Sequence, residues 1–274
     1  MTTTPAIIMV APNGARKTRA DHPALPVSIA ETVEEAVHCY ATGATILHAH
    51  VRGSKGEHVL DTGLYQELIS EMKQQAPTML VQITTEAVGR YTTQQQVSCV
   101  ESVVPEMVSI SLREMTSDFK DLAFAKNFYH WISEAEIHIQ HIIFSVDELA
   151  QFLALKQQGI IPVSQRCVLF VLGRYAVDFK SSPADLDPFL SSNLTALDWF
   201  VCAFGAREQA CAIAGIDQGG HARVGFENNL YLADGNIASG SAELVAELAK
   251  SIKAGGRPVA NADQTRELLG ICNA

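Results

Sequence analysis

The chain has 274 residues, of which 47% are hydrophobic and 18% charged, and its formal net charge is −10. This composition is typical of a globular chain with a large core, and the acidic balance argues against a general nucleic-acid surface. Its uninterrupted apolar runs stay well short of the roughly 20 residues that a transmembrane helix needs, which argues against a membrane protein.

The amino-terminal segment and the cysteines together indicate a cellular compartment. Residues 1–14 lack the positively charged start and the long apolar stretch of a signal peptide. The cysteines are scattered, form no C-x-x-C pair, and are expected to be reduced and mostly buried. We therefore expect a cytoplasmic protein. The six cysteines are Cys39, Cys99, Cys167, Cys202, Cys211 and Cys272.

Strand-like apolar runs alternate along the whole chain with segments of helical periodicity. In chain order, the strand candidates are residues 6–12, 44–51, 78–85, 107–113, 136–144, 165–173, 198–205 and 221–228.

The intervening segments carry helix start and stop signals. Ser28 followed by Glu31 forms a capping box, Pro77 ends a second helix, and Gly159 is a typical residue just past a helix end. The helix candidates include residues 28–44, 61–77, 145–159 and 239–256, followed by a short closing helix at 261–270.

Eight such βα units with short connections predict a TIM (β/α)8 barrel with a short C-terminal extension, in one domain over residues 1–274. A barrel of this kind runs to about 250 residues. The alternative is an open doubly wound sheet. It is disfavoured because the loop after the first strand, residues 11–16, holds one glycine and no dinucleotide-binding fingerprint.

In a TIM barrel the active site lies at the carboxyl ends of the strands. The polar residues expected there are Asn13, Arg16, His48, His50, Arg52, Thr84, Thr85, Glu86, Arg113, Glu114, Gln140, His141, Arg174, Arg207, Arg223, Glu227, Asn228 and Asn229.

Two of these residues, His48 and His50, point to one face of their strand because side chains alternate along a strand. Glu227 lies on the eighth strand, two places away around the barrel, and has the same parity as Arg223 and Gly225. Two histidines and one carboxylate form a typical catalytic zinc set, although iron or manganese would also accept it. The alternative is that both histidines are simply hydrogen-bonded to neighbouring carboxylates.

Four motifs carry a resemblance to a known family: "ILHAHVR" after a helix ending in "ATGA", "ARVGFENNLYL", "PEMVSIS" and "NADQTRELLGI". Together they resemble the β-keto acid cleavage enzymes over nearly the whole chain. The resemblance implies a zinc-dependent TIM barrel, usually oligomeric, that transfers an acyl group between a β-keto acid and acetyl-CoA. The products would be an acyl-CoA and acetoacetate.

The family's zinc ligands fall on His48, His50 and Glu227. The arginine of its eighth strand falls on Arg223, and the hydroxyl residue of its third strand falls on Thr84. A family aspartate with a catalytic role is replaced by Asn228, and the acidic residues of its fifth strand are replaced in residues 139–145. The segment after the fourth strand differs too, since it introduces Arg113 and Glu114.

The general base is the open question, because an asparagine at position 228 cannot accept a proton at neutral pH. Glu86, Glu114 and His141 are the alternatives. Parity allows only one of Gln140 and His141 to face inward, and we expect His141 to be the replacement base on the fifth strand. The expected catalytic set is therefore Arg223, Thr84, His141 and Asn228.

Substrate contacts are expected from residues at the same end of the barrel: Asn13, Arg16, Arg113, Glu114 and Arg174. The cluster of Arg16, Lys17 and Arg19 is suited to a substrate carboxylate or to coenzyme A phosphates, or else is a solvated loop.

Two other functions remain open. The protein could be a metal-dependent aldol or retro-Claisen lyase, or a hydrolase, without coenzyme A. It could also be a catalytically impaired metal-binding module. A homo-oligomer, a dimer or tetramer, is expected because the outer helices are rich in apolar residues. Residues 123–133 also hold more aromatic side chains than one helix face should bury. These aromatic residues are Phe124, Phe128, Tyr129 and Trp131.

Overall fold

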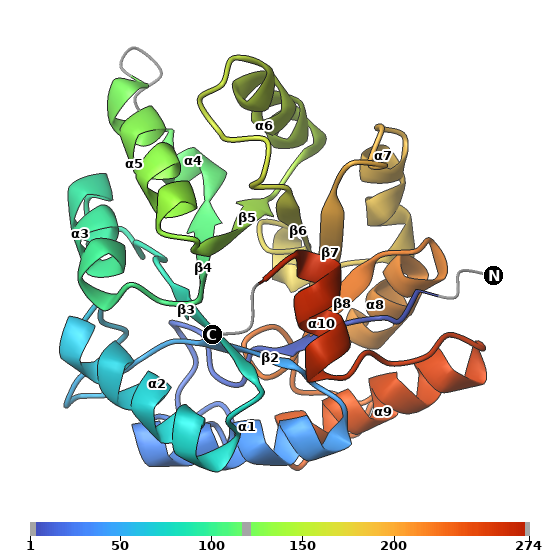
Figure 1. The fold of residues 1–274 in the computed structure, drawn as a ribbon. Helices are drawn as coiled ribbons and strands as arrows, with labels where there is room; N and C mark the ends of the chain where they lie inside the picture. Colours follow the sequence, from blue (N-terminus) through green and yellow to red (C-terminus); the bar gives the residue numbers. More distant parts are fainter. Residues whose placement is uncertain (1–3, 117–121, 272–274) are drawn as a thin grey trace.

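The protein folds as a closed barrel of eight parallel strands that pair in sequence order, with β8 closing onto β1 (Figure 1). This computed structural model describes residues 4–116 and 122–271. The predicted TIM barrel is confirmed. The strands are β1 (Ile8–Val10), β2 (Ile46–Ala49), β3 (Leu80–Thr84), β4 (Met107–Ser111), β5 (His138–Ile143), β6 (Cys167–Leu172), β7 (Asp198–Ala203) and β8 (His221–Val224).

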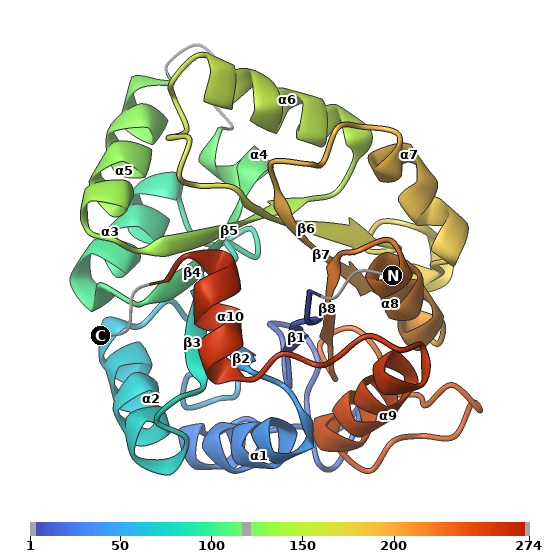
Figure 2. The same cartoon turned by 45° about the vertical axis from the view of Figure 1, so that its right-hand side comes forward.

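The helices form a ring around the strands (Figures 1 and 2). They are α1 (Ile29–Thr42), α2 (Thr62–Gln75), α3 (Thr93–Val103), α4 (Leu112–Met115), α5 (Ala123–Glu134), α6 (Val146–Gln157), α7 (Asp187–Leu190), α8 (Glu208–Asp217), α9 (Ser241–Ala254) and α10 (Ala262–Leu269), with short 3₁₀ turns η1 (Val177–Phe179) and η2 (Pro183–Leu186).

The local signals for helix ends act as predicted. Ser28 and Glu31 form a complete capping box at the start of α1, and Asp61 caps α2 by accepting from the Leu64 amide. Gly159 follows α6 at φ 67°, a left-handed conformation that a glycine adopts without strain. These caps satisfy backbone groups that have no partner within the helix.

The C-terminal helix α10 lies across the amino end of the barrel (Figure 2). Its Thr265 hydroxyl lies 2.7 Å from that of Thr45, just before β2, and Arg266 forms an ion pair with Glu106, just before β4. Because α10 covers this end, the carboxyl ends of the strands form the accessible end of the barrel.

Strand residues alternate between the barrel interior and the layer beneath the helices. On β5, the inward residue is Gln140, whose Oε1 lies 3.3 Å from Nε2 of Gln82 on β3. The next residue, His141, therefore points outward. The apolar part of the interior is filled by Ile7, Met9, Ile46, Leu80, Met107, Cys167, Leu169, Val171, Phe200 and Cys202.

The aromatic residues of α5 are mostly accounted for within one chain. Phe128 and Tyr129 are buried in the core and Trp131 is partly buried against it, whereas Phe124 is 39% exposed. Phe128 and Tyr129 thus belong to the core of one chain, whereas Phe124 stays exposed, so this helix does not bury all four aromatic side chains.

The structure also describes the state of the cysteines and the length of the apolar helices, on which the sequence analysis gave expectations. The five cysteines within the described residues are all buried and free of disulfides. Among the helices of the described residues, none is both long enough and apolar enough to cross a membrane.

Candidate active site

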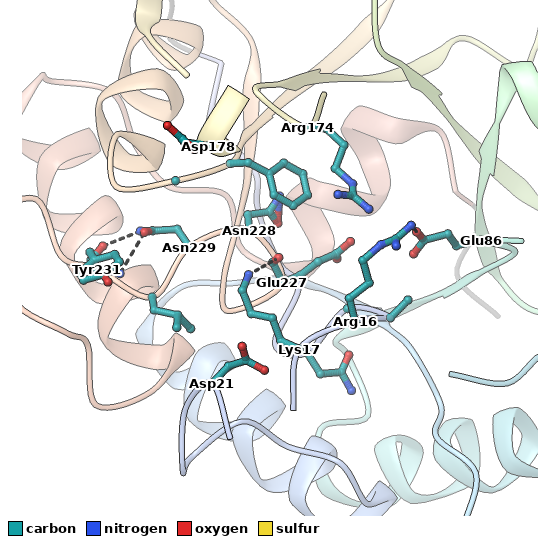
Figure 3. A pocket seen from close by; sticks show the side chains of 16 residues that line it. Arg16, Lys17, Asp21, Glu86, Arg174, Asp178, Glu227, Asn228, Asn229 and Tyr231 are labelled. Atoms are coloured by element: carbon teal, nitrogen blue, oxygen red, sulfur yellow. Dashed lines mark hydrogen bonds and ion pairs between the residues drawn. The ribbon is translucent and has the colours of Figure 1, made fainter. Parts of the chain in front are cut away.

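Two adjoining cavities open at the carboxyl end of the barrel. The outer cavity has a volume of about 410 Å³ and lies among the loops after β1, β6, β7 and β8 (Figure 3). The inner cavity has a volume of about 60 Å³ and extends toward β2 to β6. Four residues line both: Glu86, Arg174, Phe204 and Glu227.

His48, His50 and Glu227 come together where the two cavities meet. Nε2 of His48 lies 3.1 Å from Nε2 of His50 and 3.4 Å from Oε2 of Glu227. Nε2 of His50 lies 3.7 Å from Oε1 of Glu227. Ligand atoms from all three side chains therefore lie within 4.8 Å of one another.

The protonation states suit a metal ion. Burial lowers the pKa of His48 to about 4 and lowers the pKa of His50 well below its usual value, so both imidazoles are neutral near pH 7. Burial is the largest influence on the pKa of Glu227 and raises it, but electrostatic interactions with Arg223, His48, Lys17 and Arg174 together outweigh burial, so the pKa is lowered. Two neutral imidazoles beside an ionised carboxylate fit a divalent cation.

Two glycines let Glu227 reach this position. β8 ends at Val224 because Gly225 turns the chain at φ 136°, and a Cβ there would lie 2.5 Å from the Ala11 carbonyl oxygen. Gly14, in the loop after β1, packs directly on the ligand: a Cβ there would lie 2.5 Å from Cγ of Glu227. The strand parity used in the sequence analysis therefore does not extend to Glu227, which reaches the site through a turn.

Arg223 lies beside this cluster as a buried cation. Its Nη2 is 3.6 Å from Oε1 of Glu227 and 3.4 Å from Sγ of Cys202. Its Nε has no hydrogen-bond partner among the described residues, and the side chain lines the inner cavity. Thr84 lines the same cavity, and its hydroxyl accepts the Glu86 amide at 3.2 Å.

Glu86, one of the alternatives for the base, lies at the junction of the cavities. Its Oε2 is 3.9 Å from Nδ1 of His50, and its Oε1 is 3.9 Å from Nη2 of Arg16. Burial, together with the charge of Glu227, raises the pKa of Glu86 to about 7. Glu86 thus faces both cavities without belonging to the candidate metal-ligand cluster, which consists of His48, His50 and Glu227.

The basic side chains around the outer cavity differ in role. Lys17 donates to the carbonyl oxygens of Phe226 and Glu227 at 2.9 and 2.7 Å, so it supports the turn that carries Glu227. Arg16 and Arg174 instead extend into the cavity (Figure 3). Both side chains bring a positive charge to the lining of this cavity.

Two asparagines line the outer cavity with different surroundings. Asn13 donates to the His50 carbonyl at 3.0 Å and so supports the backbone of a ligand residue. Asn228 is 3% exposed, yet neither Oδ1 nor Nδ2 has a hydrogen-bond partner among the described residues. A buried amide without partners is costly unless something else satisfies it, which makes Asn228 a natural contact for a bound molecule.

Residues 5–271 match the sequence profile of the β-keto acid cleavage enzymes. The chain belongs to the β-keto acid cleavage enzyme family. It is 29% identical over 273 residues to the 3-keto-5-aminohexanoate cleavage enzyme of Fusobacterium nucleatum, covering 97% of both chains. It is 27% identical over 280 residues to the 3-oxoadipate:acetyl-CoA acetyltransferase of Cupriavidus necator, covering 98% of this chain and 96% of the relative.

Solved structures confirm the fold of this family member. The apo structure of ObcA superposes with a TM-score of 0.72 at 14% identity, covering 91% of this chain and 66% of ObcA. The complex of ObcA with oxaloacetate gives a TM-score of 0.70 at 14% identity, covering 92% and 68%. The resemblance expected from the motifs is thus confirmed at the level of family and fold.

The structure of this family member corrects the expected place of His141. His141 lies outside the barrel, where Nδ1 is 3.1 Å from the Cys167 carbonyl oxygen and the ring packs between Tyr129 and Phe152. It is fully buried and lines neither of the two cavities described above. The expectation that His141 faces the site is wrong, because the pairing of β5 with β4 and β6 turns Gln140 inward instead.

Arg113 and Glu114 are also committed to structural contacts. Nε of Arg113 donates to Glu148 at 2.5 Å and its guanidinium stacks on Phe144, so it lies behind the inner cavity rather than in its lining. Glu114 does line that cavity, but Oε2 accepts hydrogen bonds from Gln96 and from the Ala87 amide. The expectation of a substrate contact is therefore wrong for Arg113. Glu114 does belong to the cavity lining, but its Oε2 already accepts these two hydrogen bonds.

Sequence analysis missed two supporting residues. Gln82, on β3, accepts at 2.6 Å from Nδ1 of His48. Glu208, at the start of α8, is fully buried and accepts from the Gly225 amide at 3.1 Å and from Asn229 at 3.4 Å. Gln82 is two residues from Thr84 on the same strand, so the sequence indicated that both side chains face inward. Glu208 had no such signal, because its contacts join the start of a helix to the turn after another strand.

Proposed function

We propose that the protein is a zinc-dependent β-keto acid:acetyl-CoA acyltransferase. A β-keto acid, R–CO–CH₂–COO⁻, would react with acetyl-CoA to give acetoacetate and R–CO–CoA, so that the CH₂–COO⁻ unit is exchanged between two acyl groups. The observation that carries this proposal is the convergence of neutral His48 and His50 with ionised Glu227 at the junction of two cavities. The names of the relatives from F. nucleatum and C. necator support the reaction class.

His48, His50 and Glu227 would hold the zinc ion. When bound, zinc supplies Lewis-acid polarisation of a substrate oxygen. The donor set favours this assignment because structural zinc sites more often use cysteines and close all four positions. Here all three residues line the inner cavity, and Glu227 also lines the outer one.

The remaining chemistry belongs to the side chains around that cluster. Arg223 supplies a buried cation with an unpaired Nε, which suits an oxygen on which negative charge develops. Asn228 offers a donor and an acceptor to hold a carbonyl or carboxylate. Glu86 is the carboxylate placed to accept the carbon-bound proton, a role that Asn228 cannot fill.

Acetyl-CoA would enter through the outer cavity. Its volume of about 410 Å³ and its opening toward solvent suit a thioester arm. Arg16 and Arg174 line that cavity and provide positive charge for phosphate groups.

The test is a direct assay with the zinc-loaded protein, acetyl-CoA and a panel of β-keto acids. We expect acetoacetate and the matching acyl-CoA in equal amounts. His50→Ala should lose bound zinc and this activity together, whereas the exposed His38→Ala should retain both. Cleavage that proceeds without acetyl-CoA would instead identify a lyase or hydrolase. If none of the acids in the panel yields acetoacetate, the proposal is overturned.

We also propose a homo-oligomer, a dimer or tetramer. The support is the exposure of apolar side chains on the outer layer, including Phe124 in α5 at 39% and Val104 just after α3 at 56%. Light scattering should give a mass of at least twice the 29.6 kDa of one chain, and a mass of one chain at micromolar concentration would contradict it.

A further inference from the structure

The inner cavity has two chemically different walls. Its polar residues include the metal-ligand cluster, with Glu86 and Arg223 beside it. The opposite wall comes from the ends of three consecutive strands, β5, β6 and β7. This apolar wall consists of Ile142, Phe144, Val171 and Phe204, with Tyr175 beside them.

We infer that the substrate is a β-keto acid with a short, uncharged, apolar side chain, which occupies the inner cavity against this apolar wall. This inference rests on the proposed function, because it takes the reacting end of the acid to lie at the metal-ligand cluster. The acid's side chain then points away from that cluster, toward β5, β6 and β7.

The cavity volume limits the length of that side chain. A volume of about 60 Å³ accommodates roughly four to six groups the size of a water molecule. Ethyl, propyl and butyl side chains fit this space. Phe204 lines both cavities, so a longer chain would compete with the space that acetyl-CoA requires.

The charges around the inner cavity disfavour ionic side chains. A second carboxylate would share the cavity with Glu86 and Glu114, two carboxylate side chains that already line it. An ammonium group would approach Arg174, which follows β6 at the apolar wall, and Arg223. At the wall formed by Ile142, Phe144 and Val171, a side chain of either charge would lose its hydration against aliphatic and aromatic carbon, which is unfavourable.

Matched substrates test the charge argument. The zinc-loaded protein is assayed with acetyl-CoA and three acids of similar length: 3-oxohexanoate, 3-oxoadipate and 5-amino-3-oxohexanoate. We expect kcat/KM for 3-oxohexanoate to exceed the values for both charged acids by about 10²-fold. Equal or higher activity with a charged acid overturns the inference but leaves the proposed function standing. Failure of all three acids to give acetoacetate counts against the proposed function itself.

A pair of valines on β6 tests the placement of the side chain. Val171 lines the inner cavity, whereas Val168 faces the helix layer on the same strand. Val171→Ala should raise the ratio of kcat/KM for 3-oxooctanoate over 3-oxohexanoate by about tenfold, because it makes room for the longer chain. Val168→Ala removes the same carbon atoms and should leave that ratio unchanged.

An unchanged ratio in Val171→Ala, or the same change in both variants, overturns the assignment of this cavity. If Val171→Ala does not fold, Ile142→Val enlarges the same wall more gently and should shift the ratio in the same direction.

Discussion

Nδ1 of His48 lies 2.6 Å from Oε1 of Gln82, and Nε2 of Gln82 lies 3.3 Å from Oε1 of Gln140. The Gln82 oxygen can only accept, so the proton of the His48 ring is held on Nδ1. Nε2 is then left with its lone pair directed at His50 and Glu227. Gln82 therefore orients a side chain of the proposed metal site without belonging to the proposed ligand set.

Replacement of Gln82 should weaken metal binding. Gln82→Leu removes the acceptor, and we expect the metal affinity to fall about 10- to 100-fold, the usual effect of losing such a supporting contact. Gln82→Glu keeps an acceptor and should retain most of the affinity. Competition with a chromogenic chelator measures both, and equal affinities of Gln82→Leu and the parent protein would contradict this role.

Gly14→Ala should displace Glu227. The added Cβ would lie 2.5 Å from Cγ of Glu227, so the ligand side chain must move and metal content should fall. Gly159→Ala is a matched control because Gly159 has the same φ of 67° but open space around it. Elemental analysis should show loss of metal only in Gly14→Ala. Equal metal content in the two variants would show that Glu227 tolerates the contact.

Glu86→Gln should lower turnover. The amide keeps the shape of the side chain but cannot accept a proton, so kcat should fall by about 10²-fold or more. Metal content should stay near that of the parent protein, which separates this effect from loss of a ligand. The exposed Glu67→Gln should behave as the parent does. A fully active Glu86→Gln would exclude Glu86 as the base.

Asn228→Asp should lower kcat/KM rather than raise it. The new carboxylate lies next to Glu227 in the chain, where like charges repel, and it loses the Nδ2 donor of a buried amide. We expect kcat/KM to fall by at least about tenfold. A faster Asn228→Asp variant, with full metal content, would show that the base has remained at this position.

His141→Gln should change pH stability rather than catalysis. Burial lowers the pKa of His141 to about 3, whereas the unfolded chain has a histidine pKa of about 6.5. Below pH 6.5 the unfolded state therefore binds a proton that the folded state excludes, and stability is lost as pH falls toward 3. One such histidine contributes a slope of about 1.4 kcal/mol per pH unit.

Urea unfolding of His141→Gln between pH 7 and 4.5 should show a shallower loss of stability on acidification than the parent protein. Catalytic activity of His141→Gln at pH 7 should match that of the parent, and a large loss of kcat with intact folding would return His141 to the list of candidate bases.

The sequence by itself determined the barrel and the shared face of His48 and His50. Strand-like and helical periodicities alternate through the chain, and parallel strands joined by helices bring their carboxyl ends to one face. A period of two residues places His48 and His50 on the same side of β2, whatever the rest of the fold does. The family motifs around His48 and Glu227 are also local features of the chain.

Only the tertiary structure decided which polar residues reach the site. Both Gln140 and His141 are compatible with β5, and the pairing of that strand with β4 and β6 turns Gln140 inward. Gly14 supports Glu227 across a separation of more than two hundred residues. Glu86 gains its place from the packing of loops around the cavities. Such contacts depend on barrel closure, because closure sets the distance between residues that no sequence period relates.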